Sequence, residues 1–361
     1  MAASSRRTVR DVAAAAGVSV ATVSRVLNGA YPVKASTRTR VLTAMRRLDY
    51  VVDARARALN RVTSRTVAIA VHDVTAPFFA HIAHGVEQQA AAESRLCLVG
   101  ATAGDPDREL AFVSLMREQR AEAVVLVGGV VENDEYRARM RHCAEALDAA
   151  DSRLVLVGRP PLGPRVPATV VEYDNEGGSH ALTSHLLSAG HERILLLSGP
   201  RGSTTSLPRE SGYRRALRSA GVPYDRSLVV HGDLNRASGY ERMRKVLGTG
   251  ADVSAVYAGS DLVAAGVMQA VREAGLRIPD DISVAGYDDS PLAVDVVPAL
   301  TTVHLPHDEL GRMAVRLALH RDQLPKASQH AVLDTSVIVR ESVGPPPRRP
   351  RRGRPTKSRL R

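Results

Sequence analysis

The chain has 361 residues, of which 44% are hydrophobic, enough for a large buried core and two or three domains. No apolar run reaches the roughly 18 residues of a membrane span, and the basic N-terminus, residues 1–10, lacks the apolar segment of a signal peptide. The two cysteines, Cys97 and Cys143, are too few for a disulfide framework or a cysteine-rich zinc site. We therefore expect a cytoplasmic protein that needs neither a metal nor a cofactor.

The net charge of +11 is unevenly distributed along the chain. Residues 1–66 carry 13 basic and 3 acidic side chains, and residues 345–361 carry 8 basic and no acidic ones. Residues 67–344 carry 28 basic and 35 acidic side chains. Two basic ends on an acidic body suggest a polyanion-binding segment attached to a domain with another task, although a solvated surface without a partner has the same composition.

The first segment has the pattern of a helix-turn-helix, which is two helices joined by a short turn with glycine. Thr8 is expected to cap a helix over residues 8–16, with Asp11 reaching back to the cap and Gly17 ending the helix. A second helix, Val20 to Leu27, is capped by Ser19, and a third runs from about Ser36 to Leu48. The side chains expected in the interior are Val12, Ala16, Val18, Val23, Val26, Val41, Leu42, Met45 and Leu48.

In such a motif the second helix enters the major groove of DNA with its N-terminal residues on the base edges. Val20 and Ala21 would touch thymine methyl groups there, and Arg25 would pair with guanine. The other predicted contacts to bases or phosphates are Thr8, Arg10, Ser19, Thr22, Ser24, Asn28, Tyr31, Lys34 and Thr37. The alternative is a purely structural three-helix bundle, against which the surplus of arginine and the absence of acids from 12 to 48 argue strongly.

Three stretches of this segment closely resemble the start of LacI/GalR-family transcriptional regulators. They are residues 8–13 (TVRDVA), 16–19 (AGVS) and 22–29 (TVSRVLNG). The resemblance implies a homodimeric regulator, usually a repressor, that binds a roughly palindromic operator in DNA.

Residues 51–65 are expected to form a hinge helix and a linker. The helical part, residues 53–59, is too short to be stable alone and should fold only on DNA. By resemblance it lies in the minor groove, where Leu59 would be the wedge in the central base step beside Arg57 and Ala56. An ordinary core leucine is the alternative for Leu59. The segment departs from the family pattern, since Val52, Asp53 and Arg55 replace the usual Pro, Asn and apolar residue.

From residue 66 onward, continuous apolar strands alternate with helices in two successive sets. This pattern predicts two doubly wound parallel sheets, each covered by helices on both faces. Residues 66–343 resemble the periplasmic-binding-protein-like effector core of the same family. We expect one subdomain at about 66–170 and 304–330, and the other at about 171–303 and 331–343.

In open α/β sheets, ligands bind at the carboxyl ends of the strands, and the resemblance places a small-molecule effector between the subdomains. The residues expected to bind it are Asp73, Phe78, Phe79, Arg159, Ser203, Thr205, Arg209, Leu234, Ser260, Asp261 and Asp288. Carboxylates and an arginine suit sugar hydroxyls, with a phenylalanine as an apolar floor. As alternatives, Asp73 and Asp288 could cap helices, and Phe78 could belong to the core. Leu234 stands where purine-responsive relatives have an aromatic residue, which favours a carbohydrate over a nucleobase.

Residues 344–361 are rich in proline and arginine and are expected to be a disordered tail. We expect the tail to attract DNA non-specifically, with a solubilising role as the alternative, and it has no heptad pattern for a tetramerisation helix. A sugar-binding protein of a transport system is disfavoured by the helix-turn-helix and the missing signal peptide. An enzyme is disfavoured because no phosphate-binding loop, nucleophile elbow or HExxH motif is present.

Overall fold

The computed structural model describes residues 8–28, 33–48, 64–131, 133–321 and 330–347. The chain divides into one unit up to Ser64 and a second from Arg65 onward. The predicted DNA contacts Tyr31, Ala56, Arg57 and Leu59 lie outside the described residues, as does the tail from 348 onward. In the described ranges, no helix is long and apolar enough to cross a membrane.

The N-terminal unit contains the helix-turn-helix that the sequence predicts. Its described helices are α1 (Val9–Ala16), α2 (Val20–Asn28) and α3 (Ala35–Arg47). The Asp11 carboxylate accepts hydrogen bonds from the backbone N–H and the hydroxyl of Thr8, at 2.7 and 2.9 Å. Gly17 ends α1 at a φ of 61°, a left-handed conformation that favours glycine. Ser19 Oγ accepts the backbone N–H of Thr22 at 3.1 Å and so caps α2.

A small apolar core holds the three helices together, with one correction to the prediction. Its buried side chains are Val12, Ala13, Ala16, Val23, Val41 and Ala44. Leu42, which was expected inside, is 41% exposed. The reason is helical spacing: Val41, Ala44, Met45 and Leu48 share one face of α3, and Leu42 lies off that face.

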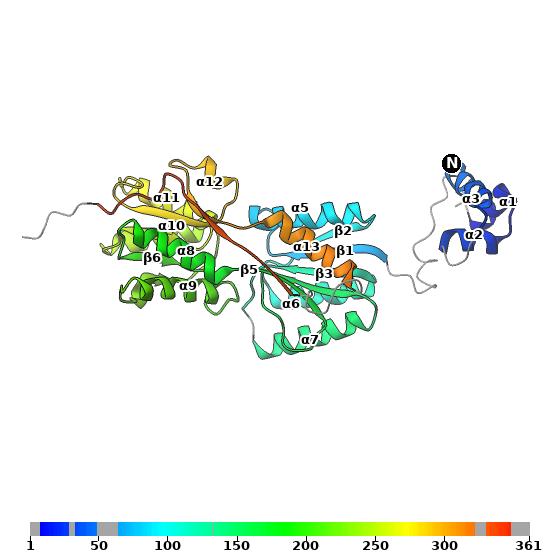
Figure 1. The fold of residues 1–361 in the computed structure, drawn as a ribbon, viewed down its shortest axis with the longest axis horizontal. Helices are drawn as coiled ribbons and strands as arrows, with labels where there is room; N and C mark the ends of the chain where they lie inside the picture. Colours follow the sequence, from blue (N-terminus) through cyan, green and yellow to red (C-terminus); the bar gives the residue numbers. More distant parts are fainter. Residues whose placement is uncertain (1–7, 29–32, 49–63, 132, 322–329, 348–361) are drawn as a thin grey trace, which may run out of the picture. The chain divides into compact units, whose positions relative to one another are not determined.

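The second unit contains two six-stranded sheets, and the first has the order β11-β5-β4-β3-β1-β2 (Figure 1). The elements of this first subdomain are β1 (Ser64–Val71), α5 (Pro77–Ala92), β2 (Leu96–Ala101), α6 (Pro106–Glu118), β3 (Ala121–Val127), α7 (Asp134–Asp148), β4 (Arg153–Val157), β5 (Ala168–Tyr173), α13 (His307–Leu319) and β11 (His330–Leu333). The pairs β1–β2, β3–β4, β4–β5 and β5–β11 are parallel. Ile82 and Leu310 pack α5 and α13 on one face, and Leu110 and Met140 pack α6 and α7 on the other.

The second sheet has the order β12-β10-β9-β8-β6-β7. Its subdomain comprises α8 (Asn175–Ser188), β6 (Ile194–Leu197), α9 (Ser206–Ser219), the 3-10 turn Arg226–Leu228, β7 (Val229–Val230), α10 (Arg236–Gly248), β8 (Ala255–Ala258), α11 (Asp261–Glu273), β9 (Ser283–Asp288), α12 (Leu292–Asp295), β10 (Thr301–His304) and β12 (Ser336–Ile338). Leu182 and Tyr213 pack α8 and α9 on one face, and Met243 and Val267 pack α10 and α11 on the other. β12 is antiparallel to β10, which departs from the fully parallel sheet that was predicted.

The chain passes between the two sheets three times, slightly later than the sequence predicts. β5 ends at Tyr173 rather than near 170, and β10 ends at His304. β11, residues 330–333, still pairs with β5 in the first sheet, so the last passage lies between β11 and β12. Helix α7 and strand β5 were not predicted. In α7 the buried side chains are only Tyr136, Met140, Ala144 and Leu147, a narrow stripe in a strongly charged segment.

The chain after β12 is fastened to the second subdomain up to residue 346. Ser342 is fully buried, and its hydroxyl donates to the carbonyl of Val284 at 2.6 Å. Gly344 donates its N–H to Ser283 Oγ at 3.1 Å and accepts a hydrogen bond from His191 Nε2 at 2.8 Å. The predicted start of a disordered tail at residue 344 is therefore too early, because hydrogen bonds to His191 and Ser283 hold Gly344 in place.

Candidate functional site

The exposed face of α2 carries the residues predicted to touch base edges. Val20 is 43% exposed, and Ala21 and Arg25 are also exposed, while Val23 on the opposite face is buried. Thr22 and Ser24 are half-buried beside them. A surface with a small apolar patch followed by an arginine one turn later matches what a major-groove helix presents to thymine methyl groups and to guanine.

The surroundings of α2 are basic. Four arginines of α3 are exposed: Arg38, Arg40, Arg46 and Arg47. Arg10 and Lys34 are exposed as well, and Thr37 is half-buried at the start of α3. Because residues 12–48 contain no acidic side chain, this part of the unit attracts a polyanion.

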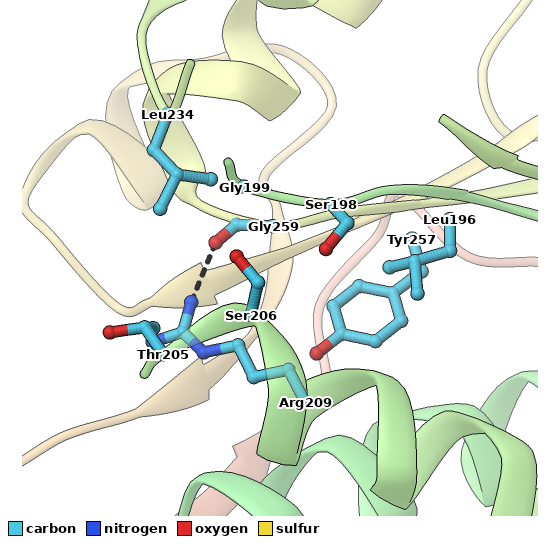
Figure 2. A pocket seen from close by; sticks show the side chains of 9 residues that line it. All are labelled: Leu196, Ser198, Gly199, Thr205, Ser206, Arg209, Leu234, Tyr257 and Gly259. Atoms are coloured by element: carbon cyan, nitrogen blue, oxygen red, sulfur yellow. Dashed lines mark hydrogen bonds between the residues drawn. The ribbon is translucent and has the colours of Figure 1, made fainter. Parts of the chain in front are cut away.

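A pocket in the second subdomain lies at the carboxyl ends of β6 and β8 (Figure 2). It is lined by Leu196, Ser198, Gly199, Thr205, Ser206, Arg209, Leu234, Tyr257 and Gly259. Three of these, Thr205, Arg209 and Leu234, were predicted effector contacts. The position agrees with the rule that ligands of open α/β sheets bind at the carboxyl ends of strands.

Arg209 is the charged side chain of this pocket, and its guanidinium contacts four other residues. Its Nε donates to the side-chain oxygen of Asn175 at 2.8 Å, and its Nη1 donates to the carbonyl of Gly259 at 2.6 Å (Figure 2). Nη2 lies 3.8 Å from a carboxylate oxygen of Asp288. The guanidinium also stacks on Tyr287, 3.6 Å from the ring centroid. These contacts hold the guanidinium of Arg209 in a fixed orientation.

Two hydroxyl groups of the pocket have no partner among the described residues. They are Ser206 Oγ and Tyr257 OH, both on buried side chains. A buried hydroxyl without a hydrogen bond is unfavourable, so both are open to a polar ligand. The open volume is about 10 Å³, far below the roughly 300 Å³ of the smallest usual ligand pockets. A sugar-sized ligand therefore requires the pocket to widen.

Two buried carboxylates, Asp261 and Asp288, belong to the same subdomain as the pocket. Asp261 accepts a hydrogen bond from the Thr302 hydroxyl at 2.6 Å and another from the N–H of Ser290 at 2.7 Å. Burial nevertheless raises the pKa of Asp261 to about 6. Burial also raises the pKa of Asp288 well above its usual range, against the attraction of Arg209. Asp288 has a φ of 109°, a rare backbone conformation for a residue other than glycine.

The loop after β3 joins the pocket to the first subdomain. The N–H of Val130 donates to Thr204 Oγ1 at 3.1 Å, and the N–H of Thr204 donates to the carbonyl of Val130 at 3.0 Å. Gly129 lies so close to Thr205 and Ser203 that a Cβ at this position would overlap the Thr205 hydroxyl. Ser203, a predicted effector contact, therefore lies at the boundary between the subdomains.

The other predicted effector contacts lie outside the pocket. Asp73 is exposed and accepts the N–H and hydroxyl of Thr75, which lower its pKa. Ser260 caps α11 by accepting the N–H of Val263 at 3.2 Å. Phe78 packs against the core, and Phe79 contacts His72 and the loop after β3.

Arg159 is held by a buried network in the first subdomain. It is 1% exposed and makes two hydrogen bonds of 3.0 Å to the two carboxylate oxygens of Glu109. Its Nε donates to the carbonyl of Gly128 at 2.8 Å, and Tyr136 donates to Glu109 as well. Burial acts to raise the pKa of Glu109, but the charge and hydrogen bonds of Arg159 outweigh it and lower the pKa.

Sequence reasoning missed Ser198, Ser206, Tyr257 and Asn175. Ser198 directly follows β6, whereas Asn175 begins α8 just after β5, a strand that was not predicted. Tyr257 is inside a predicted strand, where nothing in the sequence distinguishes a pocket residue from a core residue. Among the residues with described positions, no three His, Cys, Asp or Glu side chains are grouped to hold a metal ion.

Comparison with known proteins agrees with both parts of the structure. Residues 8–53 match bacterial regulatory proteins of the lacI family, and residues 183–343 match the periplasmic binding protein-like domain. The regulator CelR of Thermobifida fusca is 36% identical over 343 residues, which cover 93% of this chain and 98% of CelR. The regulator DegA of Bacillus subtilis is 32% identical over 341 residues, which cover 94% of this chain and 99% of DegA. This chain belongs to the LacI family of transcriptional regulators.

Other LacI-family proteins extend the comparison. The repressor PurR of Photobacterium profundum is 30% identical, with 93% of this chain and 98% of PurR covered. A CelR–cellobiose complex matches with a TM-score of 0.68 and 33% identity, covering 93% of this chain and all of that one. The lac repressor dimer bound to operator and the anti-inducer ONPF matches with a TM-score of 0.78 and 26% identity, covering 94% of this chain and 99% of that one. As a LacI-family member this chain is a DNA-binding regulator of transcription and not an enzyme.

Proposed function

We propose that this regulator represses transcription by binding a palindromic operator through α2. The exposed series Val20, Ala21 and Arg25 carries the proposal, because it combines methyl contacts with one group that can pair bidentately with guanine. Arg10, Lys34 and Thr37 would fix the position on phosphates. The predicted hinge contacts Ala56, Arg57 and Leu59 belong to the same proposal. DNA binding would place the protein in the cytoplasm.

The operator contact can be tested by replacing Arg25 with alanine. Binding to a randomised duplex library should lose its preference at one position in each half-site, since a good bidentate pair contributes about 1–3 kcal/mol. Arg38→Ala is the matched control, because this arginine is exposed on α3 and should weaken binding to all sequences alike. If Arg25→Ala also weakens all sequences alike, Arg25 contacts phosphate and the assignment is wrong.

We further propose that the effector is a neutral carbohydrate bound in the pocket around Arg209. Three observations support it. The unpartnered hydroxyls of Ser206 and Tyr257 suit ligand hydroxyls, Leu196 and Leu234 provide apolar contact, and the guanidinium of Arg209 is already occupied by Asn175, Gly259 and Tyr287. A phosphorylated or carboxylate ligand would have to compete with the hydrogen bonds that Arg209 already makes to Asn175 and Gly259. CelR, which was solved with cellobiose, is a relative in keeping with this class.

The effector would act on DNA through the boundary between the subdomains. A ligand that widens the pocket must move Thr205 and Ser203, which are packed against Gly129 of the first subdomain. Movement there reorients the first subdomain, into which the linker from the DNA-binding unit leads at Arg65. Coupling between two such sites is typically about 1–3 kcal/mol.

We propose a homodimer that pairs through β2. This strand is at the edge of the first sheet, with β1 as its one neighbour, and its apolar Leu96, Leu98 and Val99 are 61%, 38% and 52% exposed. An exposed apolar edge strand is unfavourable in water and readily pairs with another chain. A second copy of this chain is the proposed occupant, and the lac repressor, a relative, was solved as a dimer on its operator.

The effector class can be tested by thermal shift with neutral mono- and disaccharides, sugar phosphates and nucleobases. A neutral sugar should raise the melting temperature and change the affinity for operator DNA in the same concentration range. The same sugar should fail to stabilise Arg209→Met. Stabilisation by a nucleobase but by no sugar would instead support the purine alternative suggested by similarity to PurR.

A further inference from the structure

Ser198 lines the pocket directly after β6, and its hydroxyl is already engaged. The residue is 3% exposed, and its Oγ donates a hydrogen bond of 3.0 Å to the Oε1 atom of Glu210 on α9. A carboxylate carries no hydrogen and can only accept, so the proton of this bond comes from the serine. Because the Ser198 hydroxyl has one proton, a ligand meets only the lone pairs of its oxygen.

Glu210 is held in the position that this bond requires. Its side chain is 9% exposed, and Arg214 Nη2 lies 3.5 Å from one carboxylate oxygen, Oε2. His231 Nδ1 lies 3.3 Å from the other, Oε1, and 3.3 Å from the carbonyl oxygen of Gly199. Since both neighbours of Nδ1 are acceptors, this nitrogen carries its hydrogen and donates. Contacts to both carboxylate oxygens therefore fix Glu210, and Oε1 stays directed at Ser198.

Two other hydroxyl groups of the pocket differ from that of Ser198. Ser206 Oγ and Tyr257 OH have no hydrogen-bond partner among the described residues, so each can donate or accept. Ser206 lies close to Ser198 on the pocket wall, since a Cβ on Gly199, the next residue, would be 2.7 Å from Ser206 Oγ (Figure 2). Ser206 and Tyr257 can adapt to a ligand, whereas Ser198 offers one fixed role. Ser198 therefore discriminates between ligand groups that donate and groups that only accept.

We propose that Glu210 is a positioning residue for effector specificity, which takes the proton of Ser198 and so makes Ser198 Oγ an obligatory hydrogen-bond acceptor. The inference rests on the proposed carbohydrate pocket and adds what the bound sugar must offer at one place. A sugar hydroxyl can donate to Ser198, because it carries a hydrogen. A carbonyl, ether or phosphate oxygen would set lone pairs against lone pairs and leave a buried acceptor unsatisfied, which is unfavourable.

The direction of the hydroxyl can be tested without a ligand. Ser198→Cys places a thiol at the same position, and the infrared S–H stretching band moves to lower frequency when a thiol donates a hydrogen bond. The spectrum of the same chain with Ser198 is subtracted, which removes the bands of the two native cysteines. Adding Glu210→Met to Ser198→Cys should shift the band to higher frequency. Adding Glu176→Met, the same chemical change at a half-exposed carboxylate, should leave the band in place.

The effect on specificity can be tested with cellobiose, the sugar with which the relative CelR was solved. The probes are derivatives in which hydrogen or fluorine replaces one hydroxyl at a time. Both replacements remove the donor, but fluorine also adds lone pairs. At one position the fluoro derivative should therefore bind the native chain about fivefold to tenfold more weakly than the deoxy derivative, measured by calorimetry.

The variants assign this difference to single side chains. In Glu210→Met the Ser198 hydroxyl is free to turn and donate, so the difference between the fluoro and deoxy derivatives should disappear. It should disappear in Ser198→Ala as well, because no hydroxyl is left. Glu210→Gln keeps an acceptor oxygen beside Ser198 and His231 and should retain the difference. If Glu210 only stabilised the fold, Glu210→Met would weaken cellobiose and every derivative by the same factor.

The results also separate this inference from the proposed function. The inference is overturned if the thiol band does not move on Glu210→Met, or if that variant keeps the difference between the fluoro and deoxy derivatives. If cellobiose does not bind the native chain, the assignment of this sugar to the pocket fails. The infrared comparison then decides alone whether Glu210 takes the proton of the group at position 198.

Discussion

The buried pair of Arg159 and Glu109 allows a sharp test of what holds the first subdomain together. Replacing Arg159 with methionine keeps most of the side-chain volume but removes the two bonds of 3.0 Å to Glu109 and the bond of 2.8 Å to Gly128. Both charged side chains are nearly inaccessible, at 1% and 3% exposure. An unpaired buried charge of this kind typically costs about 3–5 kcal/mol of stability. For a core of this size, that corresponds to a fall in melting temperature of about 6–20 °C.

The assay is thermal unfolding followed by circular dichroism, at several pH values. In the native chain the pKa of Glu109 is lowered, so its contribution to stability is present above the ordinary carboxyl pKa and is lost as pH falls through the lowered value. In Arg159→Met, burial is the largest remaining influence on Glu109, opposed by the hydrogen bond from Tyr136 and by His72; we expect burial to raise the pKa, so the variant becomes relatively more stable as pH falls. The difference between the two proteins should therefore narrow between pH 7 and pH 5.

Two further variants decide whether the unpaired charge is the cause. Adding Glu109→Gln to Arg159→Met removes the charge and should restore more than half of the lost stability. Arg139→Met makes the same chemical change at an exposed ion pair with Asp107 and should cost less than about 1 kcal/mol. If the double variant is no more stable than Arg159→Met, the loss comes from packing and the electrostatic reasoning fails.

Three other results are expected. Arg209→Met should weaken effector binding, measured by calorimetry, at least about tenfold, because hydrogen bonds to a charged group contribute about 1.5–3 kcal/mol. Arg214→Met, half-exposed on the same helix, should leave effector binding unchanged. If both variants lose the same affinity, Arg209 does not contact the effector. Since burial raises the pKa of Asp261 to about 6, its protonated form adds stability that is full below about 3.8 and lost as pH rises through 6. Denaturant titrations of Asp261→Asn should therefore show a flatter pH profile than the native chain, and an unchanged profile would contradict the shift. Leu98→Asp should give monomers in sedimentation velocity while Val294→Asp, exposed on α12, should not, and a surviving dimer would place the interface elsewhere.

The sequence predicts well where one local rule decides the structure. Thr8, Gly17 and Ser19 define the helix ends in α1 and α2 through caps that involve residues within a few positions. The buried strands are continuous apolar runs, so their order of appearance could be predicted too. α7 was missed because nearly half of its residues are charged and only four side chains are buried, and Leu42 was misplaced because an apolar residue beside an apolar stripe looks the same in sequence as one within it.

The pocket could be predicted only in part. Arg209 was found because it lies in the segment that comes after β6, and the end of that strand is visible in the sequence. What the sequence does not show is the partner of each side chain. Arg159 also follows a strand, but a glutamate 50 positions earlier pairs with it. Tyr257 faces the pocket from within a strand, which depends on how the sheet is oriented relative to α9.

The three passages of the chain between the sheets affect how the core can be dissected. Neither subdomain is a continuous piece of sequence: the first needs residues 64–173, 307–319 and 330–333, and the second needs 175–304 and 336–346. No single truncation therefore yields either half, and a protease cut in one connection leaves two covalent links. Isolating the effector-binding half would require fusing residues near 304 to residues near 336 with a new short loop. Evolution faces the same restriction, so the two subdomains have to be inherited and exchanged together.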